Sequence, residues 1–294
     1  MAPLLLADVP WLLYRAFFSL PSSIVDGEGR PVNALLGTIN AILSAVEATS
    51  PRAVVACLGA EQAEYRVRLY PPYHAHRDPM PSPLAAQWRR APRLLESLGW
   101  WVSASEDLEA DDVMFSHAQL ERASGGQALL LTADRDLFAV VSAHVAILEP
   151  RGRDSPARIG PAQVRERYGV DPELVRDFIA LRGDPSDGLP GAPGVGAKTA
   201  ATLLRRFGSL EAVLAAAAEP SSVIAGDLRP RLAAVLRENA EQLRVFKEVA
   251  TLQRIEVAAP EDRATDLAGG ARAAAELGMK RLAARLQEMS TGQT

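Results

Sequence analysis

The sequence predicts an α/β fold, in which a mainly parallel central sheet is flanked by helices and followed by a helical C-terminal part. In the first 150 residues, short apolar runs alternate with stretches of helical periodicity, a pattern typical of parallel strands joined by crossover helices. After Pro150 only helical patterns follow, so we expect the strands to stop there. The chain has 294 residues, 48% of them hydrophobic, which is enough for a sizeable core.

The expected elements follow that alternation. Strands are predicted at residues 3–7, 52–58, 100–104, 127–132 and 144–148. Helices are predicted at 11–20, 32–48, 84–98 and 109–123, and then at 161–168, 172–181, 197–207, 210–217, 230–239, 241–249 and 270–288. We therefore expect a core over residues 1–155, which includes a mobile Pro-rich insertion, the arch, at 64–93. A helical region over 156–294 is expected to pack on that core.

Composition narrows the class of protein. The net charge is −4, so a polyanion partner would need locally clustered arginines. Cys57 is the only cysteine, which excludes an intrachain disulfide and a zinc site with several thiolates. The apolar start of the chain lacks a basic flank and reads as a first strand, and no apolar run is long enough to span a bilayer. We expect a monomeric cytoplasmic protein with no membrane partner.

Acidic residues follow the ends of the predicted strands. They are Asp8, Glu109, Asp111, Asp112, Asp134 and Asp136. In a parallel sheet these ends meet at one edge, where functional groups gather. Close carboxylates repel, and at least one pKa rises unless a cation balances them. The alternative for the cluster at 109–112 is that acidic residues only fill the first turn of a helix.

Asp184 and Asp187 stand three positions apart on a loop that can face the same edge. Scattered carboxylates suit hard divalent cations such as Mg²⁺ or Mn²⁺. Two such ions can clamp the attacking water and the leaving oxygen of a phosphodiester. In this scheme the carboxylates hold metal and are not nucleophiles.

The arch and a glycine-rich hairpin point to nucleic acid. In the arch, arginines are interleaved with Tyr65, Tyr70, Tyr73 and Trp88, which would grip a polyanion with stackable bases; the alternative is a solvated, irregular connection.

The glycine-rich hairpin is the stretch Pro193-Gly194-Val195-Gly196, which precedes a predicted helix, as in a helix-hairpin-helix. The free N–H groups of such a helix face phosphate. Lys198 and Thr199 in its first turn add a cation and a hydroxyl. Such an element binds duplexes without reading bases, although an ordinary Gly-rich turn remains the alternative.

Four motifs occur in order along the chain. They are Asp8 with Tyr14-Arg15, Glu109-Ala110-Asp111-Asp112, the stretch 132–137 and the stretch 183–191. Together they resemble the 5′-nuclease (flap endonuclease) family over essentially the whole chain. Within that family the chain is similar to the N-terminal 5′–3′ exonuclease domain of bacterial DNA polymerase I. We expect a free-standing version here, because nothing of polymerase size follows.

The resemblance implies a PIN-like sheet and two metal sites. The first would use Asp8, Glu109 and Asp111, with Asp112 bridging, and the second Asp134, Asp136, Asp184 and Asp187. It also implies that Arg66 and Arg77 contact phosphates near the scissile bond and that Tyr14 and Arg15 line the approach. The hairpin would bind downstream duplex through Gly191, Gly194, Val195 and Gly196, with K⁺ held by hairpin carbonyls.

The chain departs from the family pattern at two positions. The family usually ends its second strand with an Asp, and that position is Gly59 here, so we expect a weaker first metal site in which Glu61 or Glu64 could substitute. Losing an anionic ligand would favour Mn²⁺ over Mg²⁺ as the activator. The family's arch lysine is His74, whose charge varies near neutral pH; an idle loop histidine is the alternative.

These features predict a divalent-metal-dependent, structure-specific 5′ nuclease. Its substrates would be 5′ flaps, nicks, gapped duplexes and RNA–DNA primers in DNA replication and repair, at the nucleoid. The runner-up is a catalytically weakened relative that binds branched DNA without cutting it, as the missing ligand at Gly59 suggests. A third reading, a PIN-type ribonuclease, is disfavoured because such proteins generally lack the hairpin.

Overall fold

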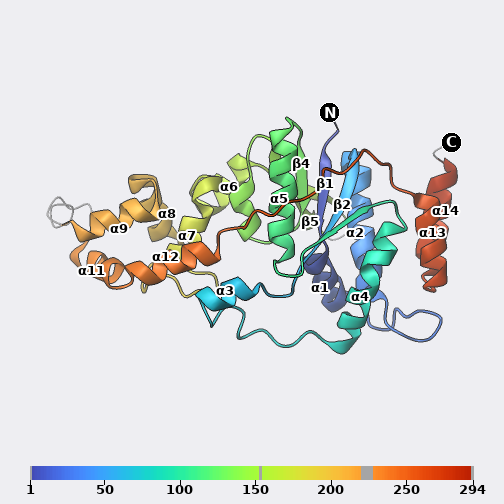
Figure 1. Ribbon diagram of the computed structural model, residues 1–294, viewed down its shortest axis with the longest axis horizontal. Helices are drawn as coiled ribbons and strands as arrows, with labels where there is room; N and C mark the ends of the chain where they lie inside the picture. Colours follow the sequence, from blue (N-terminus) through green and yellow to red (C-terminus); the bar gives the residue numbers. More distant parts are fainter. Residues whose placement is uncertain (1, 152–153, 220–227, 293–294) are drawn as a thin grey trace.

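The computed structural model describes residues 2–151, 154–219 and 228–292, and its centre is one six-stranded sheet (Figure 1). The strand order is β3-β2-β1-β4-β5-β6. The strands are β1 Leu4–Asp8, β2 Ala53–Leu58, β3 Trp101–Ala104, β4 Ala128–Leu131, β5 Val145–Arg151 and β6 Asp154–Ile159. The first five strands run parallel, which confirms the predicted α/β class.

The prediction that strands stop after Pro150 is wrong. β6 pairs antiparallel with β5 at the edge of the sheet, with Ile147 opposite Ile159. The segment DSPARI has no clear alternation and contains Pro156, and proline is tolerated in strands mainly at sheet edges. An edge strand of this composition carries little hydrophobic signal, which is why its pattern was not recognisable.

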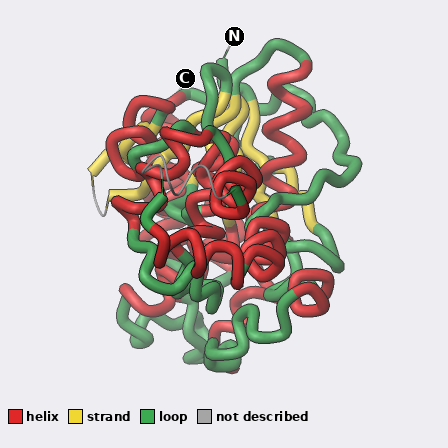
Figure 2. The backbone as a smooth tube through the Cα atoms, turned by 90° about the vertical axis from the view of Figure 1, so that its left-hand side faces the viewer, coloured by secondary structure: helices red, strands yellow, loops and turns green. Residues whose placement is uncertain are grey.

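Alternate residues of the central strands face two separate hydrophobic layers. Leu4 and Leu6 point to one side, where they pack with α5 (Ala110–Ala123) and with the helices between residues 161 and 249. Leu5 and Ala7 point to the other, where they pack with α1 (Val9–Ser19), α2 (Asn33–Thr49) and α4 (Ser82–Glu96) and with the two helices between residues 267 and 292. These strands are therefore buried on both faces, as expected for a parallel sheet. In Figure 2 the strands lie together, surrounded by helices and loops.

The helices before β6 are α1 Val9–Ser19, α2 Asn33–Thr49, α3 Glu64–Leu69, α4 Ser82–Glu96 and α5 Ala110–Ala123, and a 3₁₀ helix, η1, covers Asp136–Val140. The later ones are α6 Pro161–Tyr168, η2 Pro172–Leu174, α7 Val175–Arg182, α8 Ala197–Phe207, α9 Leu210–Ala218, α11 Pro230–Glu238, α12 Ala240–Val249, α13 Leu267–Glu276 and α14 Lys280–Gly292. The single helix predicted at 270–288 is instead two helices. Gly278 adopts φ +68° between them, a left-handed conformation that ends a helix. In the described ranges, no helix combines the length and apolarity of a membrane span.

An extended segment between α12 and α13 ties the helical region to the sheet. It runs from the end of α12 across α5 to the far side of the core (Figure 1). Its backbone donates at Gln253 to the Asp112 carboxylate, at Arg263 to the carbonyl of Arg52 and at Asp266 to the carbonyl of Leu98. The last two helices then pack in the same layer as α2 and α4.

Gln87 in α4 provides a test of how the core is assembled. The first turn of α2 has no side-chain cap of its own, and the buried Gln87 Oε1 accepts from the N–H groups of Ala34 and Leu35 at 2.8 and 3.2 Å. Because Gln87→Ala leaves these donors without their acceptor, we expect it to cost about 1–3 kcal/mol of unfolding free energy. The urea midpoint measures this, with Arg89→Ala on the exposed side of α4 as control. Equal midpoints for both variants would contradict this capping role.

Candidate active site

Asp8 lies at the topological switch point of the sheet, where the order in which strands are added reverses. β1 lies between β2 and β4, so successive strands are added on opposite sides of this point, and such switch points form crevices at the carboxyl ends of strands. Asp8 ends β1 and also caps α1, because its Oδ1 accepts from the N–H of Trp11 at 3.1 Å. Its Oδ2 accepts from the Thr132 hydroxyl, just past β4, at 2.7 Å. The local fold thus fixes Asp8 at the mouth of a cleft.

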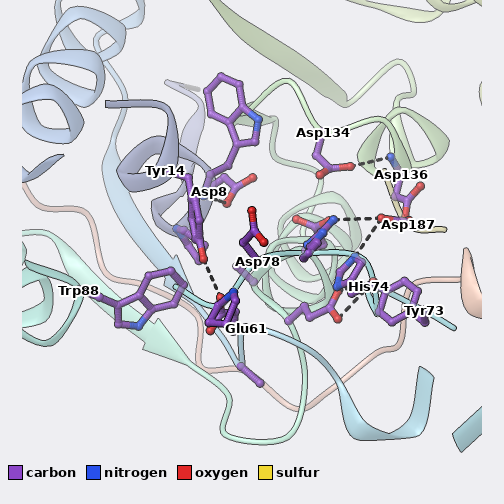
Figure 3. A pocket seen from close by; sticks show the side chains of 18 of the residues that line it. Asp8, Tyr14, Glu61, Tyr73, His74, Asp78, Trp88, Asp134, Asp136 and Asp187 are labelled. Carbon is purple, nitrogen blue, oxygen red and sulfur yellow. Dashed lines mark hydrogen bonds and ion pairs between the residues drawn. The ribbon is translucent and has the colours of Figure 1, made fainter. Parts of the chain in front are cut away.

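The cleft has a volume of about 570 Å³ and one acidic wall. Of the sequence-predicted metal ligands, those lining it are Asp8, Glu109, Asp111, Asp134, Asp136 and Asp187 (Figure 3). Asp184 lies just beneath, 1% exposed, where its charge acts on Asp134 and Asp136. The structure therefore brings seven of the eight predicted acidic ligands together from three strand ends and one loop.

The pKa values report how strongly these carboxylates are crowded. Removal from water raises the pKa of Asp8 to about 7, against a hydrogen bond from Thr132, and the charge of Asp134 adds to the rise. Removal from water, with the charge of Asp187, raises the pKa of Asp134 to about 6. The pKa values of Asp111 and Asp136 are raised well above the usual 3.8 for the same two reasons. A cation in the cleft would relieve this repulsion.

Asp112 does not join this group. It is fully buried, and both its oxygens accept from the Arg66 guanidinium at 2.9 Å, while the N–H of Gln253 donates to Oδ1 at 2.7 Å. A carboxylate held in this way faces away from the cleft, so its geometry speaks against the bridging role that we expected. Arg66 is likewise 2% exposed, is bonded to the carbonyl of Val249 and does not line the cleft, so its contact with a phosphate stays a prediction.

Glu109 lines the cleft, but its carboxylate is already bonded on several sides. Arg66 lies 2.9 Å from Oε2, the N–H of Ala63 donates to Oε1, and the Tyr73 hydroxyl contacts both oxygens at 3.0 and 3.2 Å. Tyr73 was not predicted as a site residue, although its place before His74 in the arch motif could have suggested one. Glu109 is therefore oriented by the arch.

The arch residues His74 and Arg77 lie against Asp187. His74 Nε2 and Arg77 Nη2 are 3.0 and 3.2 Å from Asp187 Oδ1, and both residues line the cleft (Figure 3). The His74 ring stacks on Tyr73 with centroids 3.8 Å apart. His74 is thus 8% exposed and bonded to a predicted ligand, unlike an idle loop residue. Arg15 is placed differently: it lies over the Trp11 ring and lines a separate groove.

Gly59 is packed against the start of α5. A Cβ built there would lie 2.5 Å from the backbone N of Ala110 and the carbonyl oxygen of Leu108, so this backbone leaves no room for an added ligand. Of the two expected substitutes, Glu61 lines the cleft and accepts from the Tyr14 hydroxyl at 2.6 Å. Glu64 is exposed and pairs with Arg68 instead.

The donor set of the cleft fits a divalent cation. Its oxygens are hard ligands, and their raised pKa values reflect uncompensated negative charge. Among the described residues, however, no three His, Cys, Asp or Glu side chains have the geometry of a preformed metal site. Binding would therefore require side-chain adjustment, and the ligand assignments stay predictions.

The hairpin lies between α7 and α8. Gly191 and Gly194 adopt φ of +69° and +78°, and Val195 is buried under the turn. The N–H of Ala192 donates to the carbonyl of Leu181, which joins the turn to α7. The first turn of α8 has no side-chain cap, and Lys198 is exposed there beside Thr199. These free N–H groups are available to a phosphate.

Comparison with known proteins shows which family this chain belongs to. Residues 3–169 match the family described as 5′-3′ exonuclease, N-terminal resolvase-like domain, and residues 170–266 match its C-terminal SAM fold. A 5′-3′ exonuclease of Mycobacterium tuberculosis is 36% identical over 98% of this chain and 97% of that protein. One of Streptomyces coelicolor is 37% identical over 78% and 80%. DNA polymerase I of Mycobacterium bovis is 34% identical over 85% of this chain, which spans only 28% of that protein.

Solved structures share the fold at low sequence identity. A complex of the bacteriophage T5 flap endonuclease with DNA and metal ions is 17% identical, with a TM-score of 0.68 over 98% of this chain and 99% of that one. The catalytic core of Rad2 with a DNA substrate is 14% identical, with a TM-score of 0.62 over 97% and 92%. The fold and its acidic cleft define an α/β nuclease. The chain belongs to the 5′-3′ exonuclease family, and the predicted 5′ nuclease class is confirmed.

Because Gly59 is closely packed, we expect Gly59→Asp to destabilise the protein and not to restore a metal ligand. Overpacking against the backbone of Leu108–Ala110 should cost about 1–3 kcal/mol. Thermal unfolding and Mg²⁺ titration test this, with Gly27→Asp as control, because Gly27 has open space around it. Unchanged stability together with tighter Mg²⁺ binding would show that the site accepts the added carboxylate.

The raised pKa of Asp8 predicts that stability without metal falls as pH rises. Between pH 3.8 and about 7 the folded state binds more protons than the unfolded chain. In this window each such carboxyl lowers the free energy of unfolding by up to about 1.4 kcal/mol for every unit that the pH rises. His117, whose pKa is lowered to about 4, acts in the opposite sense up to pH 6.5. We therefore compare wild type with Asp8→Asn in EDTA from pH 5 to 8. The unfolding free energy of Asp8→Asn should fall less steeply with pH than that of wild type. Parallel profiles would show that the pKa of Asp8 is not raised.

Proposed function

We propose that this chain is a divalent-metal-dependent, structure-specific 5′ nuclease that cuts phosphodiester bonds where a 5′ single strand meets duplex DNA. One observation carries the proposal: six of the predicted carboxylate ligands line a cleft at the switch point of the sheet, with Asp184 buried directly beneath it, and four of these seven groups have raised pKa values. Crowding of this kind is costly for stability, and it is typical of sites built to hold cations.

Two groups of side chains would hold Mg²⁺ or Mn²⁺. One contains Asp8 and Asp111, with Glu109 oriented beside them, and the other contains Asp134, Asp136, Asp184 and Asp187. When bound, the ions would supply Lewis acidity and lower the pKa of water. Since Glu109 is occupied by Arg66 and Tyr73, the first group has fewer free oxygens than the second.

The remaining cleft residues act on the substrate. Arg77 is 46% exposed at its side chain and lies at the rim of the acidic wall, where its guanidinium can pair with a phosphate once Asp187 turns to a cation. His74 lies beside it and can donate a further hydrogen bond. Tyr14 is positioned by Glu61, and burial and Glu61 raise the pKa of its hydroxyl, which stays protonated.

The hairpin supplies duplex binding away from the cleft. Its exposed Gly194 and Lys198 line one groove together with Arg229 and Arg231 at the start of α11. Backbone amides and cations in one groove bind phosphates without reading sequence. We propose that K⁺ at the hairpin carbonyls assists this contact. The natural substrates would be nicked, gapped or 5′-flapped DNA and RNA–DNA primer hybrids, cut by a monomer with the core at 1–155 and the helical region at 156–294.

A second candidate, a weakened relative that only binds branched DNA, rests on the absence of a ligand at Gly59. Against it, every carboxylate of the second group is present and faces the cleft or lies directly beneath it. A protein that had lost catalysis would have no reason to retain such repulsive charge.

Asp134→Asn should reduce cleavage of a 5′-flap duplex at least about 100-fold in Mg²⁺ or Mn²⁺, because it removes a central carboxylate of the cleft. The experiment uses a 5′-labelled flap and follows product length. Asp171→Asn is the matched control, since Asp171 pairs with Arg165 on the surface. EDTA should abolish cleavage in every variant.

Three outcomes separate the candidates. Cleavage by wild type that Asp134→Asn abolishes supports the nuclease. Tight binding of the flap by wild type without any cleavage supports the weakened relative. Cleavage of free single-stranded RNA in preference to the flap would favour a ribonuclease.

A further inference from the structure

The acidic cleft also contains a nitrogen atom that can ligate a cation. The chain has four histidines, at positions 74, 76, 117 and 144. His74 is the one that lines the cleft, on the side of Asp136 and Asp187 (Figure 3). At this position the chain departs from the family's lysine. A charged lysine has no electron pair to offer a cation, whereas a neutral imidazole has one. The substitution therefore changes what the cleft can bind.

The His74 ring is held against the acidic wall by its own backbone. His74 adopts φ +55°, a left-handed conformation in which His, Asn and Asp are enriched among non-glycine residues. Its N–H donates to the carbonyl of Asp187 at 3.3 Å, and its carbonyl accepts from the N–H of Arg77 at 2.9 Å. On one face the ring stacks on Tyr73. The imidazole therefore has a fixed position beside the loop that carries Asp187.

The two nitrogens of this ring have different surroundings. Nε2 lies 3.0 Å from Asp187 Oδ1. Because a carboxylate only accepts, Nε2 carries the hydrogen of this bond, and in a neutral ring Nδ1 then carries the free electron pair. Nδ1 is buried and has no hydrogen-bond partner among the described residues. Buried polar atoms normally have a partner, and a bound ion is a recognised reason why a protein atom lacks one.

His117 provides a comparison, since its Nδ1 is also buried without a partner in the described part of the chain. It lies on α5 outside the cleft, where burial lowers its pKa to about 4. His74 instead lies against Asp187, whose charge also raises the pKa values of Asp134 and Asp136. The unpaired nitrogen of His117 is thus a cost of burial, whereas that of His74 lies among negative charges.

We propose that His74 is a nitrogen ligand of the cation held by Asp134, Asp136 and Asp187. This inference rests on the proposed metal-dependent function and names a ligand that makes the site selective. Carboxylates and water suit Mg²⁺, whereas imidazole favours later first-row ions such as Co²⁺, Ni²⁺ and Zn²⁺. The site therefore prefers Co²⁺ to Mg²⁺ by a larger factor than carboxylates alone would give.

The fixed ring also gives the carboxylates a point to converge on. Binding requires side chains to turn, because the described ranges contain no preformed group of three ligands. The ring nitrogen that does not ligate keeps its hydrogen, as is usual for a metal-bound histidine. It can therefore still donate to Asp187 or to a phosphate.

Binding of the metal alone tests the ligand. Calorimetric titration of the full chain with Co²⁺ and with Mg²⁺ compares wild type with His74→Asn, because asparagine also tolerates the left-handed backbone. The variant should bind Co²⁺ at least about tenfold more weakly, while its affinity for Mg²⁺ stays within about twofold of wild type. His76→Asn is the matched control and should change neither affinity, because His76 is exposed outside the cleft. Equal weakening for both ions would show that His74 only positions Asp187 and would overturn the proposal.

A spectroscopic signature tests direct coordination. In proton NMR of the Co²⁺-loaded protein without DNA, a ligating imidazole gives a strongly shifted N–H signal that disappears in heavy water. Wild type and His76→Asn should show this signal, and His74→Asn should lack it. Its absence from wild type would overturn the proposal even if a 5′ flap is cleaved, and the nuclease would stand. A signal that depends on His74 in a protein that cleaves no flap would keep the ligand and reject the nuclease.

Discussion

Carboxylates that face one another at the carboxyl ends of β1 and β4 repel, and the surrounding structure holds them there against that repulsion. Asp8 is fixed by the first turn of α1 and by Thr132, and Thr132 also accepts from the N–H of Asp134. The Asp8 carboxylate is thus bonded to both neighbouring elements, and the Asp134 carboxylate accepts from the N–H of Asp136. Both faces of the sheet are buried under helices, so the strands cannot move apart to relieve the repulsion. The negative charge therefore stays concentrated at the ends of the strands.

Asp112 is separated from the other carboxylates because it is buried in an ion pair with Arg66. A buried ion pair seldom adds net stability, but removing one partner is costly. Here the pair joins three parts of the chain: α3 at the base of the arch, α5 beside the cleft, and the end of α12 with the segment that follows it, through Val249 and Gln253. Its role is positional, since it sets where Glu109 and the arch stand relative to the sheet.

The sequence predicted the fold where hydrophobic pattern and topology act together. Five strands were recognisable because each is an apolar run, and the acidic edge followed from where those runs end. The prediction failed for elements whose position depends on tertiary contacts. β6 is a polar edge strand, and Gly278 divides a segment whose helical periodicity looks continuous. Asp111 and Asp112 are neighbours in sequence, yet one faces the cleft and the other faces Arg66. Successive residues of a helix point about 100° apart, so the two side chains must diverge, but the sequence does not show which one meets Arg66.

Gly59 shows why a missing side chain cannot be judged from an alignment alone. The space beside Gly59 is filled by the backbone that begins α5, so a side chain at this position would need that backbone to move. Glu61 lies two residues further on, where it lines the cleft and holds Tyr14. A carboxylate on this side thus orients an aromatic ring, while the charge needed for a cation is concentrated toward Asp134, Asp136 and Asp187.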